Sequence, residues 1–233
     1  TLDGGNYTIG AGPYAFGAVT TNGVLVLGQV TSFGAVALGS DTTFDSHLGS
    51  HAIDFASTVD GGFALTANAG GGAVTFSGLV GKGAALASLT VTGATTLDAN
   101  VTTIGAQTYN SAVTLGNSIT LATAGAVDFV GTVDATGFGL QGLTVNAGSG
   151  PVTFGNAVGS GQALASLAVT GPTILDGNVT TTGAQTYNSG VTLGNSVTLA
   201  TSGNAVDFLG TVDATAAGAQ GLTVSAGAGL VMR

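Results

Sequence analysis

The 233-residue sequence contains no cysteine, no tryptophan and no glutamate, and only 6% of its residues are charged. Without cysteine the chain cannot form disulfides or thiol-based catalytic, zinc or iron–sulfur sites. Its only basic residues, Lys82 and Arg233, are outnumbered by eleven aspartates, which gives a formal net charge of −9. So few cations cannot neutralise phosphates, which excludes nucleic acid as a main partner and argues against an anionic membrane surface. No run of 18 apolar residues is present, so we expect no membrane insertion.

Hydrophobic residues make up 44% of the chain, which is enough for a core and argues against disorder. Long helix-favouring side chains are scarce, whereas threonine, valine and the 42 glycines dominate. Threonine and valine suit extended strands, and glycine suits tight turns. We therefore predict an all-β protein.

The chain repeats itself at a constant offset of 78 residues. Residues 83–118 return as residues 161–196, with about 29 of 36 positions identical. A motif of alanine, an aliphatic residue, aspartate and phenylalanine, followed by Thr-Val-Asp, occurs three times, at residues 52–60, 126–134 and 205–213. A fixed period is typical of arrays whose units bury their apolar faces against each other. We predict one continuous body over residues 1–233, with a diverged partial unit (1–61) and two repeat units (62–141 and 142–233).

Short runs of apolar, polar and apolar residues recur within each unit, such as Val113-Thr114-Leu115 and Val152-Thr153-Phe154. This alternation is typical of strands with one buried face, and glycine, asparagine, serine or aspartate separates the runs. Four turns of about 19–20 residues would fill 78 residues, which predicts a right-handed parallel β-helix, or β-solenoid. About 12 such coils would form a rod of roughly 55–60 Å at ~4.8 Å per strand. Tandem immunoglobulin-like sandwiches are the main alternative fold, but the sub-repeat is too short for them.

The segments GAQTYNSAVTLGNSITL, GLTVNAGSGPVTFGNAVG and LASLAVTGPTIL resemble the repeat region of bacterial filamentous-haemagglutinin-type adhesins. The resemblance covers nearly the whole chain, most clearly residues 62–230. It implies a right-handed β-helical shaft, secreted and extracellular or attached to the bacterial surface, with an adhesive or fibre-forming role. The family's secretion domain is not seen at the N-terminus, and no toxin tip or Arg-Gly-Asp tripeptide is found. The chain therefore resembles the shaft of such a protein.

The repeated aspartates are the first candidate for chemistry. Burial of Val127 and Phe129 would point Asp128 outward, and the same parity places Asp134 outside. Equivalent aspartates four coils apart would be about 19 Å from each other. Calcium would need several oxygens at ~2.3–2.6 Å, drawn from adjacent coils with Asp98 or Asp176 as contributors. We favour solvated or turn-capping aspartates over a calcium site and expect no cofactor.

The only histidines lie in the segment Asp45-Ser46-His47-Leu48-Gly49-Ser50-His51. This region is three residues longer than its counterpart in the next unit, which predicts a loop that bulges from the coil. Asp45, His47 and His51 are the weak candidates for a metal site, because aspartate and histidine bind divalent ions when their geometry allows it. We favour an incidental polar loop and expect no metal or catalytic residues.

Catalysis by a β-helix would require clustered carboxylates or a basic group that stabilises an anion. The chain has no glutamate and one internal lysine, so we predict that it is not an enzyme, although paired aspartates such as Asp54 and Asp60 are left open. Threonines such as Thr90 and Thr114 offer ice binding as an alternative, and the repeated Tyr109-Asn110 offers sugar stacking. For that tyrosine and asparagine we favour packing and corner capping.

Both ends of the sequence remain strand-like, for example at residues 221–224 and 229–231. An uncapped solenoid edge pairs with further strands. We therefore expect either an excerpt of a longer adhesin or subunits that join end to end into a homopolymer. The predicted function is non-enzymatic and structural or adhesive, with a host surface or glycan as a further partner. The alternative is a lateral face that binds glycan or ice.

Overall fold

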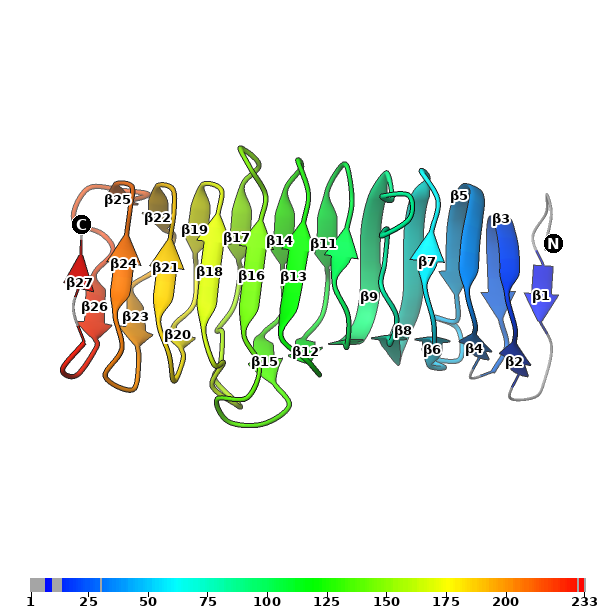
Figure 1. Cartoon of the computed structure of the whole chain (residues 1–233), viewed down its shortest axis with the longest axis horizontal. Helices are drawn as coiled ribbons and strands as arrows, with labels where there is room; N and C mark the ends of the chain where they lie inside the picture. The colour runs from blue at the N-terminus through cyan, green and yellow to red at the C-terminus, as the bar shows by residue number, and fades with distance from the viewer. Residues whose placement is uncertain (1–6, 10–13, 30, 230, 233) are drawn as a thin grey trace.

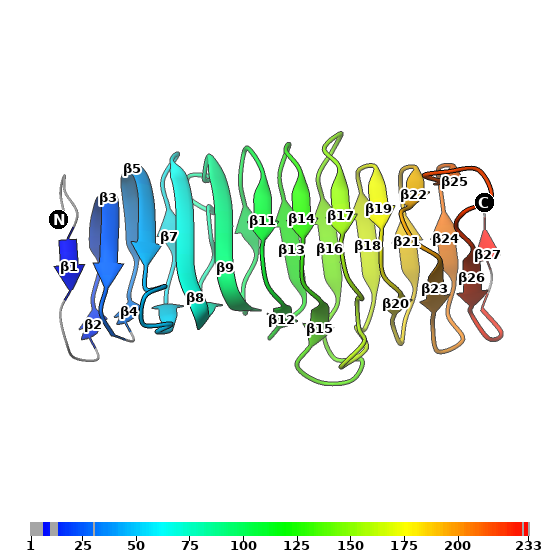
Figure 2. The same cartoon turned by 180° about the vertical axis from the view of Figure 1, so that it is seen from behind.

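The computed structural model describes residues 7–9, 14–29, 31–229 and 231–232. In this part of the chain every regular element is a strand, every strand pair is parallel, and no helix could cross a membrane. The strands stack side by side along one axis as a β-solenoid of about 10 turns (Figures 1 and 2). The stack is about 50 Å long at ~4.8 Å per strand. The expected 12 coils were therefore about two too many.

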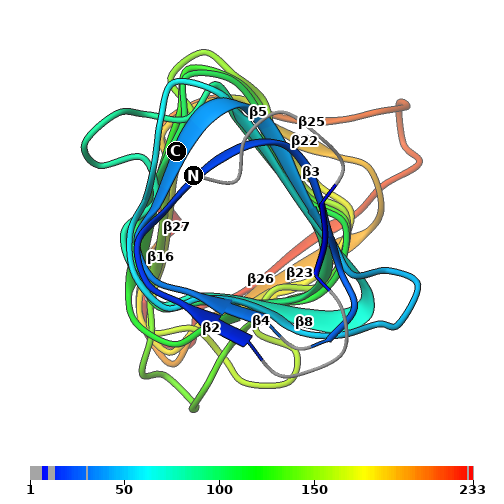
Figure 3. The same ribbon diagram turned by 90° about the vertical axis from the view of Figure 1, so that its right-hand side faces the viewer.

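The solenoid has three sides (Figure 3). Consecutive strands lie in turn on face 1, face 2 and face 3. Viewed from the N-terminal end, β25, β26 and β27 follow one another clockwise as the chain recedes, which makes the solenoid right-handed.

Each face has its own set of strands. Face 1 carries β1 (Tyr7–Ile9), β11 (Gln107–Tyr109), β14 (Val127–Phe129), β17 (Val152–Phe154), β19 (Thr173–Leu175), β22 (Val191–Leu193) and β25 (Val212–Ala214). Face 2 carries β2 (Tyr14–Phe16), β4 (Thr31–Phe33), β6 (Ile53–Phe55), β12 (Val113–Leu115), β15 (Val133–Ala135), β20 (Val179–Thr180), β23 (Val197–Ala200) and β26 (Leu222–Ser225). Face 3 carries β7 (Val59–Asp60), β10 (Val101–Thr102), β13 (Ile119–Ala122), β16 (Leu143–Asn146), β18 (Leu167–Thr170), β21 (Gln185–Tyr187), β24 (Val206–Phe208) and β27 (Val231–Met232).

Four long strands bend around a corner and belong to two faces. These are β3 (Val19–Leu27) and β5 (Val36–Asp45), which join face 3 to face 1, and β8 (Ala64–Phe76) and β9 (Ser88–Leu97), which join face 1 to face 2. Single bridging residues, Val80 on face 3 and Val158 on face 2, complete the ladders.

The alternation expected from the sequence is observed. In β14 the side chains of Val127 and Phe129 are buried and Asp128 lies outside. The buried residues form one continuous hydrophobic cluster that extends from Leu25 to Ala226. Because every coil contributes to it, the core has no interruption at which one unit ends and the next begins.

Coil length varies along the rod. On face 1 the paired residues Gln107, Val127, Val152, Thr173 and Val191 are separated by 20, 25, 21 and 18 residues. The strands themselves stay short and in register, so the corners absorb the differences. The position of a residue on a face therefore does not follow from a constant number of residues per turn.

The 78-residue repeat does not contain a whole number of turns. The identical strands β11 and β21 are separated by eleven strand positions, counting the bridge at Val158. Eleven positions on a three-sided coil are three and two-thirds turns, and not the four that the sequence suggested. Each copy of the unit is therefore displaced by about 18 Å along the axis at ~4.8 Å per turn and rotated by one face.

The aromatic residues show this rotation inside the core. Face 2 holds a stack of Phe16, Phe33, Phe55 and Phe76, with ring centroids 4.9–6.0 Å apart. Face 1 holds Tyr109, Phe129 and Phe154 at 5.3 and 5.2 Å, and face 3 holds Tyr187 and Phe208 at 5.4 Å. Each of the three faces thus has one aromatic stack, beneath one copy of the aspartate–phenylalanine motif.

Glycine allows the corners to close tightly. Gly93 and Gly171 are equivalent residues with φ of 128° and 133°, a backbone region that is unfavourable for other residues. A Cβ on either one would lie 2.5 Å from a carbonyl oxygen of the preceding coil, that of Gly72 or Gly150. Gly93 turns the chain from face 1 to face 2 and Gly171 turns it from face 3 to face 1, so the same corner serves two different edges.

Candidate functional sites on the loops and lateral faces

Two outward aspartates cap loops of the following coil. The Asp60 carboxylate oxygen Oδ1 accepts hydrogen bonds from the backbone N–H groups of Gly83 and Ala84, at 2.7 and 3.2 Å. Asp134 makes the same pair of contacts with Gly161 and Gln162, again at 2.7 and 3.2 Å. This confirms turn capping for these aspartates, because a carboxylate that accepts two N–H groups fixes the loop on which they lie.

The three copies of the aspartate–phenylalanine motif point to three sides of the rod. Asp54 lies on face 2, Asp128 on face 1 and Asp207 on face 3. Asp54 accepts a hydrogen bond of 2.7 Å from Ser32. The expectation that equivalent aspartates would line up every four coils on one face is therefore wrong.

Asp128 and Asp207 are partly enclosed by their neighbours. Partial burial raises the pKa of the Asp128 carboxyl above its ordinary value, and the negative charge of Asp176 raises it further. In Asp207 the carboxylate oxygen Oδ1 is buried and has no hydrogen-bond partner among the described residues. These carboxylates are held by the strands and are spaced too far apart to act as a pair.

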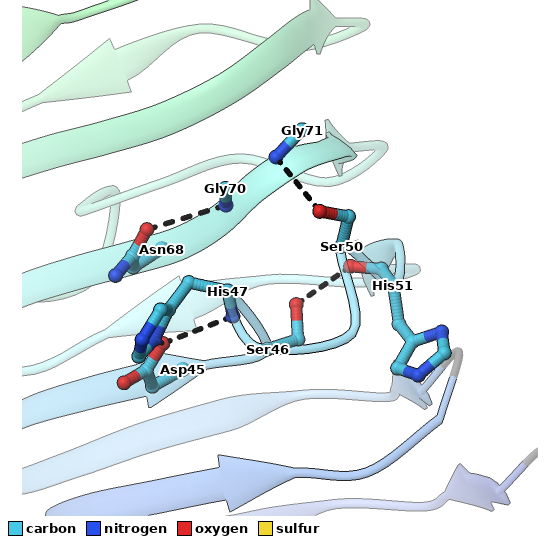
Figure 4. A network of polar contacts seen from close by, with 8 residues as sticks. All are labelled: Asp45, Ser46, His47, Ser50, His51, Asn68, Gly70 and Gly71. Atoms are coloured by element: carbon cyan, nitrogen blue, oxygen red, sulfur yellow. Dashed lines mark hydrogen bonds and ion pairs between the residues drawn. The ribbon is translucent and has the colours of Figure 1, made fainter.

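The histidine segment forms an exposed loop of residues 46–51 between face 1 and face 2, as predicted (Figure 4). His47 Nδ1 lies 2.6 Å from Asp45 Oδ1, and the same oxygen accepts the His47 backbone N–H at 3.1 Å. The His51 ring points away from this pair, while its carbonyl oxygen accepts a 2.6 Å hydrogen bond from Ser46 Oγ. The structure thus brings together Asp45 and His47 but not His51.

No group of three metal-ligating side chains occurs in the part of the chain that the structure describes. Asp98 and Asp176, considered as contributors to a calcium site, lie at corners. There their backbone carbonyl oxygens accept hydrogen bonds from Asn117 and Asn195, at 2.7 and 3.0 Å. These asparagines join each corner to the coil before it.

A buried polar network was not anticipated from the sequence. Gln107 is fully buried, and its Nε2 donates to Thr103 Oγ1 at 3.2 Å and to the Ala122 carbonyl oxygen at 3.1 Å. The Tyr109 hydroxyl lies 3.3 Å from Gln107 Oε1. Residues Thr181, Gln185, Tyr187 and Ala200 repeat these contacts on face 3. The signal in the sequence was the exact return of a glutamine two residues before a buried tyrosine.

The same observation removes sugar stacking from consideration. Tyr109 and Tyr187 have no exposed surface, and burial raises the pKa of both phenols far above the ordinary value. The following asparagines, Asn110 and Asn188, donate to Thr92 Oγ1 and Thr170 Oγ1 of the preceding coil at 3.1 and 3.2 Å. The tyrosines pack and the asparagines join coils, as expected for a structural role.

Threonines form a continuous outward column on face 1. Thr43, Thr66, Thr90 and Thr108 are neighbours in four successive paired strands, and Asp128 follows them. The adjacent column, two residues further along each strand, is Asp45, Asn68, Thr92 and Asn110. Only the Thr90/Thr92 coil therefore carries the Thr-x-Thr pair.

The largest surface depressions lie on face 3 near the N-terminal half. One shallow groove of about 400 Å³ is lined by Leu79, Val80, Gly81, Lys82, Asn100 and Thr102. A second of about 320 Å³, on the preceding coils, is lined mainly by alanine, valine and threonine together with Asp60. Neither groove brings two carboxylates together, and Asp60 is already engaged in capping the loop beyond it.

Comparisons with protein-family models, with curated proteins and with solved structures find no match for this chain. Its own geometry, that of a β-solenoid with tandem repeats, is therefore the basis for a functional proposal.

Proposed function

We propose that this chain is a non-enzymatic shaft, part of a bacterial surface adhesin or of a self-associating surface or matrix fibre outside the cell. The observation that carries the proposal is the single hydrophobic core that runs through every coil from Leu25 to Ala226. Each coil contacts only its neighbours, so tandem duplication lengthens such a body without redesign.

The rotation of the repeat supports a mechanical role. Tyr109 and Tyr187 have the same buried partners on different faces, so the unit works equally well in either orientation. A shaft needs its units to be interchangeable, whereas a site that acts on one ligand needs its residues to converge in one place. The outward aspartates instead point in three directions.

The test is to lengthen the chain by one unit. A second copy of residues 83–160, inserted after Ser160, should extend the particle by about 18 Å along its long axis, at ~4.8 Å per turn. Small-angle X-ray scattering and electron microscopy should show the same cross-section for both proteins. A particle that grows wider instead, or a round particle in either case, would contradict the proposal.

Ice binding by a lateral face is the second candidate, because the column from Thr43 to Thr108 presents hydroxyls at the regular strand spacing. The substitution Thr90→Tyr should then abolish thermal hysteresis. Thr186→Tyr, at an outward position on face 3, is the matched control. A wild-type chain without thermal hysteresis would dismiss this candidate and leave the shaft proposal unaffected.

A further inference from the structure

The two terminal coils of the described structure present unpaired strand edges. Among the described residues β25 pairs only with β22, β26 only with β23, and β2 only with β4. The core side chains at these edges are only partly buried, namely those of Phe16 and Val19 at one end and of Val212, Leu222 and Val224 at the other. Such edges bind further parallel strands, because an edge strand leaves backbone N–H and C=O groups without a neighbouring strand.

The faces of the two edges are in phase with each other. The path begins on face 1 with β1, and its last strand, β27, lies on face 3, immediately before the path would return to face 1. A second copy placed against the C-terminal edge therefore continues the same screw path with β1, β2 and β3 on the same faces. It needs no rotation about the axis.

We infer that a second copy of this chain stacks on the C-terminal edge head to tail, with its β2 paired in parallel with β26. The inference rests on the proposed function, for which it supplies the partner and the register of the contact. Face 2 sets this register, because Leu222 and Val224 are the partly exposed core residues of β26 whereas Ala226 is already buried. Phe16 of the incoming copy then covers Val224, and Ala15 lies beside Thr223 on the outside.

The side-chain parity of both strands agrees with this pairing. In β26 the exposed residues are Thr223 and Ser225, and in β2 Ala15 is exposed while Phe16 is turned toward the core. Within the chain the stacking of Phe16 on Phe33 at 5.5 Å shows the packing that the same ring makes on its other side. The contact is heterologous, so it propagates and does not close.

Cysteine cross-linking in the 233-residue chain tests the register, since the sequence has no cysteine of its own. Residues opposite each other on neighbouring strands are within disulfide distance, with Cα atoms about 4.4–6.8 Å apart. The double variant Ala15→Cys/Thr223→Cys should form covalent oligomers of three or more chains under mild oxidation. The control pair Ala15→Cys/Asp213→Cys combines face 2 with face 1 and should remain monomeric, as should each single variant.

The outcomes separate this inference from the proposed function. Fibres whose cross-links form with the control pair, or with neither pair, overturn the register but leave the shaft intact. Isolated rods of about 50 Å at every concentration, the length expected from the strand spacing, overturn the stacking of copies. Dimers formed by the single Thr223→Cys variant overturn the head-to-tail polarity. Round particles overturn both proposals.

Discussion

Tyr109 and Tyr187 occupy the same place in two copies of one sequence, yet their rings lie on different faces of the solenoid. Each ring is fully buried, and each hydroxyl lies 3.3 Å from the glutamine two residues before it. Seventy-eight residues thus carry the chain through three and two-thirds turns without any change in local packing. Local contacts with the coils before and after determine the structure of a unit, and its orientation about the axis does not.

If orientation is irrelevant, equivalent substitutions on different faces should have equal effects. Gln107→Ala and Gln185→Ala should each lower the free energy of unfolding by about 1–3 kcal/mol, because each leaves buried polar groups unpaired. Urea denaturation followed by circular dichroism measures both. Thr108→Ala, which changes the outward neighbour of Gln107, should stay within about 0.5 kcal/mol of the wild type.

The aromatic stack on face 1 should make a large contribution to stability. Phe129 lies between Tyr109 and Phe154, at ring-centroid distances of 5.3 and 5.2 Å. Phe129→Ala should cost about 3–5 kcal/mol through lost burial and the cavity left behind. Leu140→Ala, at a side chain that is 69% exposed, is the control and should have an effect below about 0.5 kcal/mol. Similar losses for the two variants would contradict the assigned core.

The capping role of Asp134 predicts a graded loss. Asp134→Ala removes the acceptor for the N–H groups of Gly161 and Gln162 and should destabilise the protein by about 1–3 kcal/mol, with faster hydrogen exchange at both amides. Asp134→Asn keeps a side-chain oxygen and should lose less. A loop that exchanges at the wild-type rate in the alanine variant would dismiss this role.

The buried tyrosines should make stability fall at alkaline pH. Burial raises the pKa of Tyr109 and Tyr187 in the folded state far above the ordinary value of 10.0. The folded state therefore favours the neutral phenols. Their contribution to stability is complete below about pH 10 and declines above it, because only the unfolded chain ionises there. Absorbance of phenolate should show that these two tyrosines titrate together with unfolding, and the variant Tyr109→Phe/Tyr187→Phe should lose this step.

Asp128 should act in the opposite range of pH. Its raised folded-state pKa means that the neutral carboxyl is favoured, so its contribution is complete below the ordinary pKa of 3.8 and is lost as pH rises through the folded value. Asp128→Asn should therefore raise the melting temperature at pH 7 and leave it nearly unchanged at pH 3. Thermal unfolding of both proteins at the two pH values measures this. An equal shift at both would mean that charge is not the cause.

Sequence reasoning predicted the strand class and the direction in which side chains point. The alternation of Val127, Asp128 and Phe129 was sufficient for this, since successive side chains of a strand face opposite sides. It also predicted the exposed loop around His47 and the capping by Asp134, because both depend on neighbours close in the sequence or on simple polar chemistry. The contact of Gln107 with the Ala122 carbonyl oxygen could not be predicted, because it joins coils whose relative register was unknown.

The sequence by itself determined that this chain is an all-β repeat protein with its apolar side chains inside and its threonines and aspartates outside. Only the tertiary structure decided which face each residue occupies. The reason is that corners of different lengths, such as the 25-residue and 18-residue coils that begin at Val127 and Thr173, contribute equally to one turn. Turns are counted by strand pairing and not by residues, so eleven strands in 78 residues rotate the repeat by one face.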